Sequence, residues 1–385
     1  MTQARPLRLF VLIDALGWQF LEGRSTFCDF LTHRVPLRTI LGFSSGAIPT
    51  ILTGVPPAQN GHWNLFYYDP QGSPFHWLRF FSFLPDRLID NRVSKKALKE
   101  LGRRILGMGP LFECSVSPRL LPWFNYVEKR NIYDRGGITG ASSIFDWLGH
   151  SGVPYRVYSY HHSSDQEIFK LARHDLENTD ARFFFLYLSE MDIFLHNNCT
   201  DEGKWTTKLA WYNTELERVF RVAEQIDPDV RFTLFSDHGM TPVKKHYDVV
   251  KQIEALGYEM PRDYLAVYDS TMARFWFFNS NARDRIVERL KELPAGRILP
   301  DQELQQLGIL FHDQRYGEVI FLMHPGWLLS RSDFNGCNWM PVGMHGYHPD
   351  DANSDAVFLS SHRPQTTVRN IADIYPCMKS AAQFI

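Results

Sequence analysis

Five short apolar runs, separated by stretches with helical periodicity, most limit how this chain can fold. They cover residues 7–13, 155–160, 182–188, 231–235 and 356–360. Runs of this length and composition are typical of strands buried inside a sheet. Residues 204–226 carry apolar side chains at three-to-four spacing, which predicts an amphipathic helix between two of the runs. We therefore expect an α/β fold with a mostly parallel central sheet and helices on both faces.

Two stretches interrupt this alternation within what we expect to be a single domain over residues 1–385. Residues 65–135 are rich in Phe, Pro and Arg and contain one predicted helix over 94–106. Residues 262–335 begin with an alternating pattern that predicts a hairpin, followed by a helix near 282–293 and a further strand over 318–323. We interpret the first stretch as an insertion and the second as a cap subdomain.

Composition excludes several classes of protein. The formal net charge is -2 and no block of like charge is present, which argues against a nucleic-acid polymer or a membrane surface as partner. The apolar runs are far shorter than the ~18 residues of a membrane span. The N-terminal run leads at once to Asp14, so it resembles a core strand more than a signal peptide. Five scattered cysteines without CxxC spacing indicate reduced thiols and a cytoplasmic location. No pattern specifies an oligomeric state.

Carboxylates and imidazoles stand where three of the predicted strands end. Asp14 closes the first run, Asp192 and His196 follow the third, and Asp237 and His238 follow the fourth. The carboxyl ends of neighbouring parallel strands meet at one sheet edge, where ligands bind. Carboxylates held close together repel one another unless a cation lies between them. Each Asp could alternatively cap the next helix, but the set together predicts a site for divalent metal.

A candidate nucleophile precedes a short predicted helix that ends at Thr53 and Gly54. The stretch over 42–54 reads GFSSGAIPTILTG, with Ser44 and Ser45 at the start of the helix. Serine is a common helix N-cap, so a capping role is the structural alternative. A hydroxyl at a helix N-terminus also faces the positive end of the dipole, which suits a phosphate. Capping and catalysis are compatible at this position.

The order of these motifs resembles the alkaline phosphatase superfamily, most closely its type I phosphodiesterase/nucleotide pyrophosphatase branch. The motifs that carry the resemblance are Asp14, Ser44 before ILTG, DIFLH (192–196), SDHGM (236–240) and GMHGY (343–347). The resemblance implies an alkaline phosphatase-like fold and a phosphoric ester hydrolase. It also implies two divalent ions, Zn²⁺ with Mn²⁺ as the alternative. Their ligands would be Asp192, His196 and His345 for one ion, and Asp14, Asp237, His238 and the Ser44 oxygen for the other.

The resemblance further implies that Ser44 attacks a small-molecule phosphate ester and forms a phospho-enzyme, with Ser45 as the fallback nucleophile. Ala47 stands where the family carries an active-site Asn, so the contacts to the phosphoryl oxygens differ here. A phosphodiesterase or pyrophosphatase-like activity is the leading hypothesis. A phosphomonoesterase or a phosphotransferase on the same fold is the alternative, and a non-catalytic binding protein is a third.

Several further polar residues have an open role. His62 and Asn64 could line the pocket and replace the missing Asn, or could support a loop. Arg274 could contact a substrate anion or form a salt bridge at a strand edge. The aromatic residues of 62–84 could form extra core or the wall of a pocket. Histidines without a matching family motif are interpreted as structural or surface residues; they are His161, His162, His246, His324 and His348.

Overall fold

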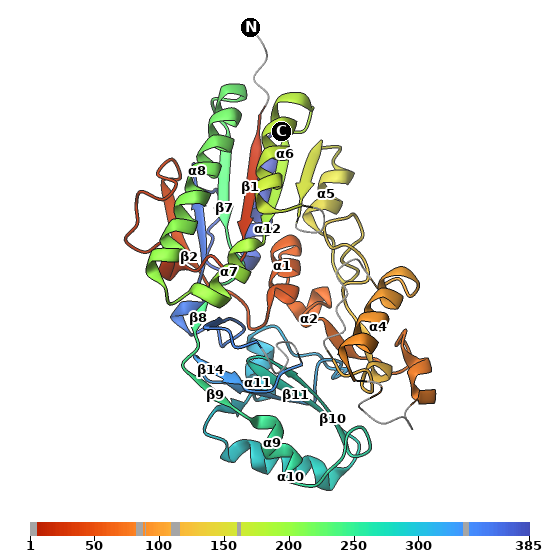
Figure 1. The fold of residues 1–385 in the computed structure, drawn as a ribbon. Helices are drawn as coiled ribbons and strands as arrows, with labels where there is room; N and C mark the ends of the chain where they lie inside the picture. Colours follow the sequence, from red (N-terminus) through yellow and green to blue (C-terminus); the bar gives the residue numbers. More distant parts are fainter. Residues whose placement is uncertain (1–5, 82–87, 89, 109–115, 160–162, 334–338) are drawn as a thin grey trace.

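A six-stranded sheet forms the centre of the fold in the computed structural model, which describes residues 6–81, 88, 90–108, 116–159, 163–333 and 339–385. Figure 1 shows the strands side by side in one half of the molecule. Their order across the sheet is β2 (His33–Leu37), β16 (Ala356–Ser360), β7 (Arg231–Phe235), β1 (Arg8–Ile13), β6 (Phe183–Leu188) and β5 (Tyr155–Tyr158).

The sheet confirms the five predicted strands and adds one. β7, β1, β6 and β5 are parallel to one another, while β16 runs antiparallel to both β7 and β2. Sequence reasoning missed β2, whose sequence HRVPL contains a proline and two basic residues. β2 is an edge strand, and an edge strand tolerates proline and polar residues because one side of it has no neighbouring strand.

Helices cover both faces of the central sheet. Successive residues of β1 point to opposite faces: Leu9 and Val11 pack in one core cluster, and Phe10 and Leu12 in the other. The first face is covered by α6 (Asp165–Asn178), α7 (Glu190–Asn198) and α8 (Glu202–Ile226), and the second by α1 (Ser44–Thr53), α5 (Ile144–His150) and α12 (Ile374–Ala382). α8 confirms the helix predicted over 204–226. In the described part of the chain no helix is both long and apolar enough to cross a membrane.

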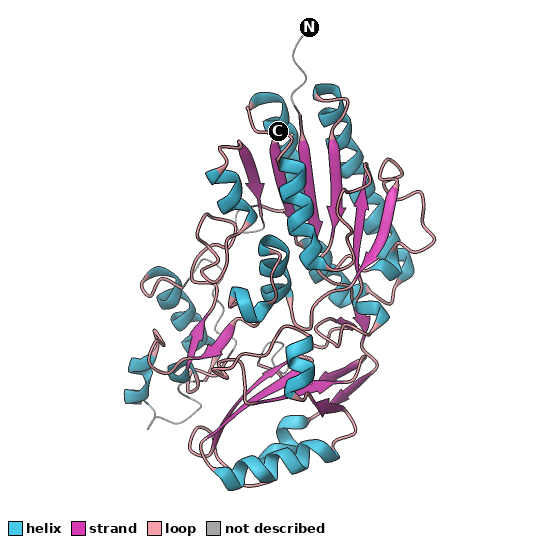
Figure 2. Ribbon diagram, turned by 180° about the vertical axis from the view of Figure 1, so that it is seen from behind, coloured by secondary structure: helices cyan, strands magenta, loops and turns pink. Residues whose placement is uncertain are grey.

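A second, antiparallel sheet lies beyond the carboxyl ends of the central strands, as Figure 2 shows from behind. Its order is β10 (Tyr264–Asp269), β11 (Met272–Phe277), β13 (Val319–Met323) and β12 (Gly296–Ile298). The predicted hairpin, strand and helix are confirmed. Helices α9 (Val249–Glu254) and α10 (Ser280–Glu292) pack on one face, and α11 (Asp301–Gln306) packs in a core cluster with residues of β11 and β13. A capping role for this unit stays a prediction.

The aromatic-rich stretch after residue 62 is partly core and partly surface: Trp63, Phe66 and Phe75 are buried, whereas Trp77, Phe80 and Phe81 are exposed. β3 (Phe66–Tyr68) pairs with β4 (Phe124–Tyr126), and Phe66 and Phe75 pack with Trp276 of the second sheet. The predicted helix over 94–106 is confirmed as α4 (Arg92–Arg104). The remaining short elements are α2 (Pro57–Asn60), β8 (Thr241–Pro242), β9 (Lys245–Tyr247), β14 (Trp327–Leu329), β15 (Gly343–Met344) and 3₁₀ turns at Trp18–Phe20, His76–Phe81, Leu121–Trp123, Ala352–Ser354 and Ile371–Asp373.

Three of the five cysteines lie in the described residues. Cys28, Cys199 and Cys377 are free thiols and are buried. Burial raises the pKa of the Cys199 thiol to about 11, so this sulfur stays protonated and unreactive near neutral pH. Cys114 and Cys337 lie outside the described residues.

Candidate active site

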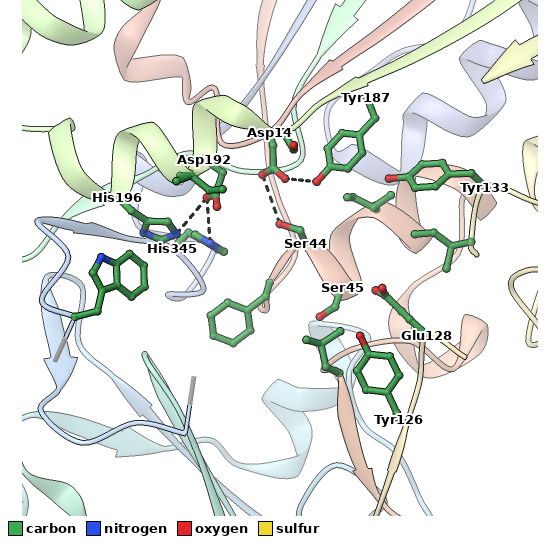
Figure 3. A pocket seen from close by; sticks show the side chains of 17 residues that line it. Asp14, Ser44, Ser45, Tyr126, Glu128, Tyr133, Tyr187, Asp192, His196 and His345 are labelled. Atoms are coloured by element: carbon green, nitrogen blue, oxygen red, sulfur yellow. Dashed lines mark hydrogen bonds and ion pairs between the residues drawn. The ribbon is translucent and has the colours of Figure 1, made fainter. Parts of the chain in front are cut away.

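The seven residues singled out from the sequence converge at the carboxyl ends of β1, β6 and β7. Asp14 directly follows β1, Asp237 and His238 follow β7, and α7, which carries Asp192 and His196, begins just after β6. Figure 3 shows several of these side chains facing one pocket, with Ser44 entering from the start of α1. His345 arrives from a distant part of the chain. The pairing of β15 with β8 places it beside the segment that follows β7.

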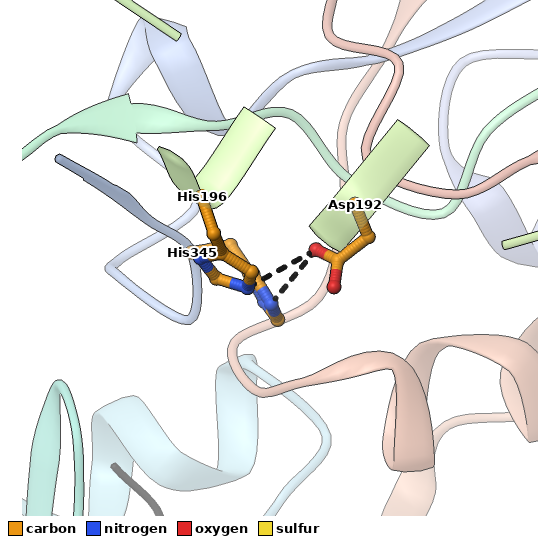
Figure 4. Close-up of side chains that lie close together, drawn as sticks. All are labelled: Asp192, His196 and His345. Carbon is orange, nitrogen blue, oxygen red and sulfur yellow. Dashed lines mark ion pairs between the residues drawn. The ribbon is translucent and has the colours of Figure 1, made fainter. Parts of the chain in front are cut away.

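One group consists of Asp192, His196 and His345 (Figure 4). Asp192 Oδ1 lies 3.3 Å from His196 Nε2 and 3.4 Å from His345 Nε2. His196 Nδ1 lies 2.8 Å from the carbonyl oxygen of Gly343, an acceptor that places the ring proton on Nδ1 and leaves the Nε2 lone pair facing the carboxylate. A backbone partner of this kind orients metal-binding histidines in proteins.

The second group consists of Asp14, Asp237 and His238. His238 Nε2 lies 3.5 Å from Asp14 Oδ1 and 3.2 Å from Asp237 Oδ2. One oxygen of Asp237 is anchored, because Oδ1 accepts hydrogen bonds from the backbone N–H groups of Ala15 and His238. The other oxygen, Oδ2, faces the group and has no hydrogen-bond donor among the described residues. Asp14 is anchored in the same way by the hydroxyl of Tyr187.

The two groups adjoin one another and form a donor set suited to divalent cations. The rings of His238 and His345 are stacked, with centroids 3.9 Å apart. Asp192 Oδ1 and Asp237 Oδ2 are buried oxygens for which the described part of the chain supplies no hydrogen-bond donor. An unsatisfied buried carboxylate oxygen is costly, and a cation removes this cost. Mixed carboxylate and imidazole ligands suit Zn²⁺ and other divalent transition metals. The residues present therefore fit the metal pair that the family resemblance implies.

The protonation tendencies of these groups reflect their crowding. Burial, together with Asp237 and Asp192, raises the pKa of Asp14 well above its ordinary value. Burial also acts to raise the pKa of Asp192, but His196 and His345 outweigh it and the pKa is lowered. Burial and the neighbouring His238 lower the pKa of His345, which favours the neutral imidazole that a metal requires.

Ser44 and Ser45 have different surroundings. Ser44 Oγ lies 3.0 Å from His238 Nε2 and 3.5 Å from Asp14 Oδ1. Ser45 Oγ instead donates to the backbone oxygen of Trp63 at 3.0 Å. The capping alternative is wrong for both, because Phe43 occupies the N-cap position of α1 and no side chain caps it. Gly54 ends the helix in the left-handed conformation, as its place after Thr53 predicted.

Two supporting residues escaped the sequence analysis. The carboxylate of Asp165 accepts hydrogen bonds from the backbone N–H groups of Ser189 and Glu190 at 3.0 and 3.2 Å, where α7 begins, and from the Tyr212 hydroxyl. Tyr187 carries the one hydroxyl in the otherwise apolar strand β6. That isolated polar group was the sequence signal that could have indicated its contact with Asp14. The sequence around Asp165 indicates only the start of a helix, because Ser164 caps α6 by accepting a hydrogen bond from the N–H of Glu167. Nothing in it indicates the contact with α7.

A cavity of about 430 Å³ opens beside Ser44. Aromatic and aliphatic side chains form most of its wall away from the two Asp and His groups, and one carboxyl, that of Glu128, points into it (Figure 3). Sequence reasoning missed Glu128, since no motif marks it. The pocket-facing aromatic residues include Phe43, Tyr126, Tyr133 and Trp339.

The other candidate residues differ in their distance from this cavity. His62 is buried and lines a separate cavity, so it does not line the pocket around Ser44. Asn64 is buried and lines a small cavity that shares Phe43 and Ser45 with the pocket, so its role beside the site stays a prediction. Arg274 is fully buried and pairs with Asp269 at 2.7 Å, which makes it a salt bridge within the second sheet and not a substrate contact.

The remaining histidines follow the structural interpretation where they are described. His348 Nε2 lies 3.0 Å from Glu303, and His246 and His324 are exposed. His161 and His162 lie outside the described residues.

This fold and this ordered set of motifs define a phosphoric ester hydrolase of the alkaline phosphatase superfamily. A sequence profile described as type I phosphodiesterase / nucleotide pyrophosphatase matches residues 43–348. The chain belongs to this family, which confirms the resemblance seen in the motifs. A search of curated proteins finds no significant match.

Solved structures support the fold. Human ectonucleotide pyrophosphatase/phosphodiesterase 5 superposes with a TM-score of 0.69 at 14% identity, over 99% of this chain and 95% of that one. An inactive variant of the murine enzyme, solved in complex with AMP, gives a TM-score of 0.68 at 15% identity, over 98% and 95% of the two chains. At these identities the likeness concerns the architecture alone.

Proposed function

We propose that the chain hydrolyses phosphodiesters through a covalent phosphoseryl intermediate on Ser44, beside a site for two divalent ions. One observation carries this proposal. Six Asp and His side chains form two adjoining groups of metal-ligand composition, and the Ser44 hydroxyl lies within 3.5 Å of Asp14 and His238. A hydroxyl in such surroundings is an activated nucleophile.

Two steps account for the reaction. Ser44 Oγ attacks phosphorus, the bond from phosphorus to the departing alcohol breaks, and that alcohol leaves with the proton that Ser44 gives up. Water then attacks the phosphoseryl group, the bond from phosphorus to Ser44 Oγ breaks, and a phosphomonoester is released. Placement of Ser44 in the first turn of α1 aims the positive end of the helix dipole at the phosphoryl group.

The chain offers a defined ligand set for the two ions. Asp192, His196 and His345 would hold one, and Asp14, Asp237, His238 and the Ser44 oxygen would hold the other. Bound divalent ions supply Lewis-acid stabilisation of developing negative charge and lower the pKa of a nearby hydroxyl. Zn²⁺ is the proposed metal, because both groups mix imidazole with carboxylate, and Mn²⁺ is the alternative.

Activity against model esters tests the proposal. After chelation, the protein is reloaded with Zn²⁺ or Mn²⁺ and assayed on bis-p-nitrophenyl phosphate, p-nitrophenyl phosphate and a nucleotide diester, the last because a structural relative was solved with AMP. We expect the diesters to be hydrolysed faster. A preference for the monoester would favour a phosphomonoesterase, and product transfer to an added alcohol would favour a phosphotransferase. A metal-loaded sample that turns over no ester would point to a binding protein.

Ser44→Ala and Ser45→Ala form a matched pair of variants. Ser44→Ala should lower kcat on bis-p-nitrophenyl phosphate by roughly 10³-fold or more while metal content stays normal. Ser45→Ala should stay within about tenfold of the parent enzyme, because the Ser45 hydroxyl bonds a backbone carbonyl and none of the Asp and His side chains of the two groups. The reverse order of effects would make Ser45 the nucleophile. Full activity in both variants would refute a serine intermediate.

A further inference from the structure

Glu128 places one carboxyl in the wall of the catalytic cavity. The residue lies just beyond β4, and its side chain points toward Ser45, with Tyr126 beside it (Figure 3). Among the described residues that line the cavity, no Lys or Arg is present. The part of the cavity beyond the metal-ligand groups is therefore a poor match for a second phosphate, which proteins usually bind with cationic side chains.

The carboxyl of Glu128 has no partner within the described part of the protein. No hydrogen bond or ion pair to it exists there, in contrast to Asp14, Asp165 and Asp237, which all accept hydrogen bonds from protein groups. Burial raises the pKa of Glu128 to about 7. An unpaired carboxylate in a partly buried place is costly, and the cost is offset when a ligand brings a positive charge to it.

One aromatic ring is the immediate neighbour of Glu128 in the cavity. Tyr126 lies beside Glu128, while Tyr133 lies next to Tyr187, with ring centroids 5.8 Å apart, farther along the same wall. Tyr126 is held in place by its edge-to-face contact with Phe66, whose ring centroid is 5.5 Å away. The faces of aromatic rings attract cations, and proteins use aromatic side chains to bind quaternary ammonium groups. The carboxyl of Glu128 beside Tyr126 adds an opposite charge for such a group.

We propose that Glu128 and Tyr126 form a subsite for an ammonium group carried by one esterified alcohol of the substrate. This inference rests on the proposed phosphodiesterase function and narrows its substrate class. The phosphoryl group then lies at Ser44, and the cationic end of one alcohol reaches Glu128. Glu128 forms no hydrogen bond with Ser44, so it selects the substrate and takes no part in the transfer of the phosphoryl group.

A pair of isosteric diesters isolates the charge. Both carry p-nitrophenol as the chromogenic alcohol; the second alcohol is 2-(trimethylammonio)ethanol in one and 3,3-dimethylbutanol in the other, which differ by one nitrogen for carbon. In the parent enzyme we expect kcat/KM to be about tenfold or more higher for the cationic diester. In Glu128→Gln this preference should fall to about threefold or less, through a loss on the cationic diester only.

Asp134→Asn is the matched control, because Asp134 is an exposed acid on the same segment and does not line the cavity. It should keep the parent's preference for the cationic diester. A second measurement needs no variant: tetramethylammonium should inhibit hydrolysis of bis-p-nitrophenyl phosphate competitively, and tert-butanol at the same concentration should not. This measurement keeps the test decisive if Glu128→Gln fails to fold.

The outcomes separate the two proposals. A parent enzyme that hydrolyses both diesters equally and ignores tetramethylammonium would overturn the ammonium subsite while the phosphodiesterase function stands. An equal loss on both diesters in Glu128→Gln would also overturn it, since that pattern indicates a general structural role. Turnover of neither diester nor of bis-p-nitrophenyl phosphate by the metal-loaded parent would refute the phosphodiesterase function, and the subsite with it.

Discussion

Removal of the Asp165 carboxylate should weaken both the fold and the metal site. Asp165 lies at the start of α6 and accepts hydrogen bonds from two backbone N–H groups where α7 begins, and from the Tyr212 hydroxyl. In return, the N–H of Asp165 donates to Glu190 Oε1 at 3.2 Å. Because α7 carries Asp192 and His196, the contact positions two proposed metal ligands without touching a metal.

The size of the effect follows from these contacts. Hydrogen bonds to a charged group contribute roughly 1.5–3 kcal/mol each, so the three together would amount to about 4.5–9 kcal/mol if they were additive. Single substitutions rarely cost more than about 4–5 kcal/mol, which we take as the upper limit. Burial raises the pKa of Asp165 to about 6, so ionisation at pH 7 costs part of this gain. We therefore expect Asp165→Ala to lower the free energy of unfolding by about 2–3 kcal/mol at pH 7.

The raised pKa also fixes the sign of the pH dependence. The folded state holds the proton of Asp165 up to about pH 6, whereas the unfolded chain releases it near pH 4. The folded state therefore binds more protons in this window, and the contribution of Asp165 to stability rises as the pH falls through it. The destabilisation caused by Asp165→Ala should be larger at pH 5 than at pH 7.

Asp146→Ala is a matched control for the assay. Asp146 also accepts two backbone N–H bonds and one hydroxyl bond, from Ser143 and Gly136, but it supports α5 and is partly exposed. Urea unfolding gives the stability of each variant, and titration with Zn²⁺ gives metal affinity. Asp165→Ala should lose about 10–100-fold in metal affinity. Asp146→Ala should lose stability alone. Equal metal affinity in all three proteins would refute the positioning role of Asp165.

Three further changes have defined outcomes. Tyr187→Phe removes the hydroxyl that anchors Asp14 and should lower kcat/KM on a diester by about 10–100-fold with little change in thermal stability; an unchanged rate would contradict it. Gly239→Ala brings a Cβ to 2.1 Å from the Asn353 carbonyl oxygen. The free energy of unfolding should fall by roughly 1–3 kcal/mol, which lowers the melting temperature by several degrees. Chelation should also lower the melting temperature, because the three carboxylates Asp14, Asp192 and Asp237 lose their counter-charge, and Zn²⁺ should restore it.

Much of the central sheet could be predicted because its strands carry a strong local signal. β1 is apolar after its first residue, Arg8, and β6 is apolar apart from the hydroxyl of Tyr187, since both faces of these parallel strands are covered by helices. β2 could not be predicted in this way, because an edge strand with a proline has no such pattern. The second sheet was visible as a hairpin, but its contact with the aromatic stretch after residue 62 was not.

The amino-acid sequence alone determined the set of residues at the candidate site. Asp14 and Asp237 stand where apolar strands end, and the order of motifs up to His345 identified the family. This was possible because the ends of parallel strands must meet at one sheet edge.

Only the tertiary structure decided which contacts these polar side chains make. It placed the Ser44 hydroxyl next to His238 and the Ser45 hydroxyl on a backbone carbonyl, and it placed His62 in a separate cavity. It also brought Glu128 into the cavity wall and Asp165 to the start of α7. Local sequence does not carry this information, because the direction of a loop side chain depends on packing against segments far away in the chain.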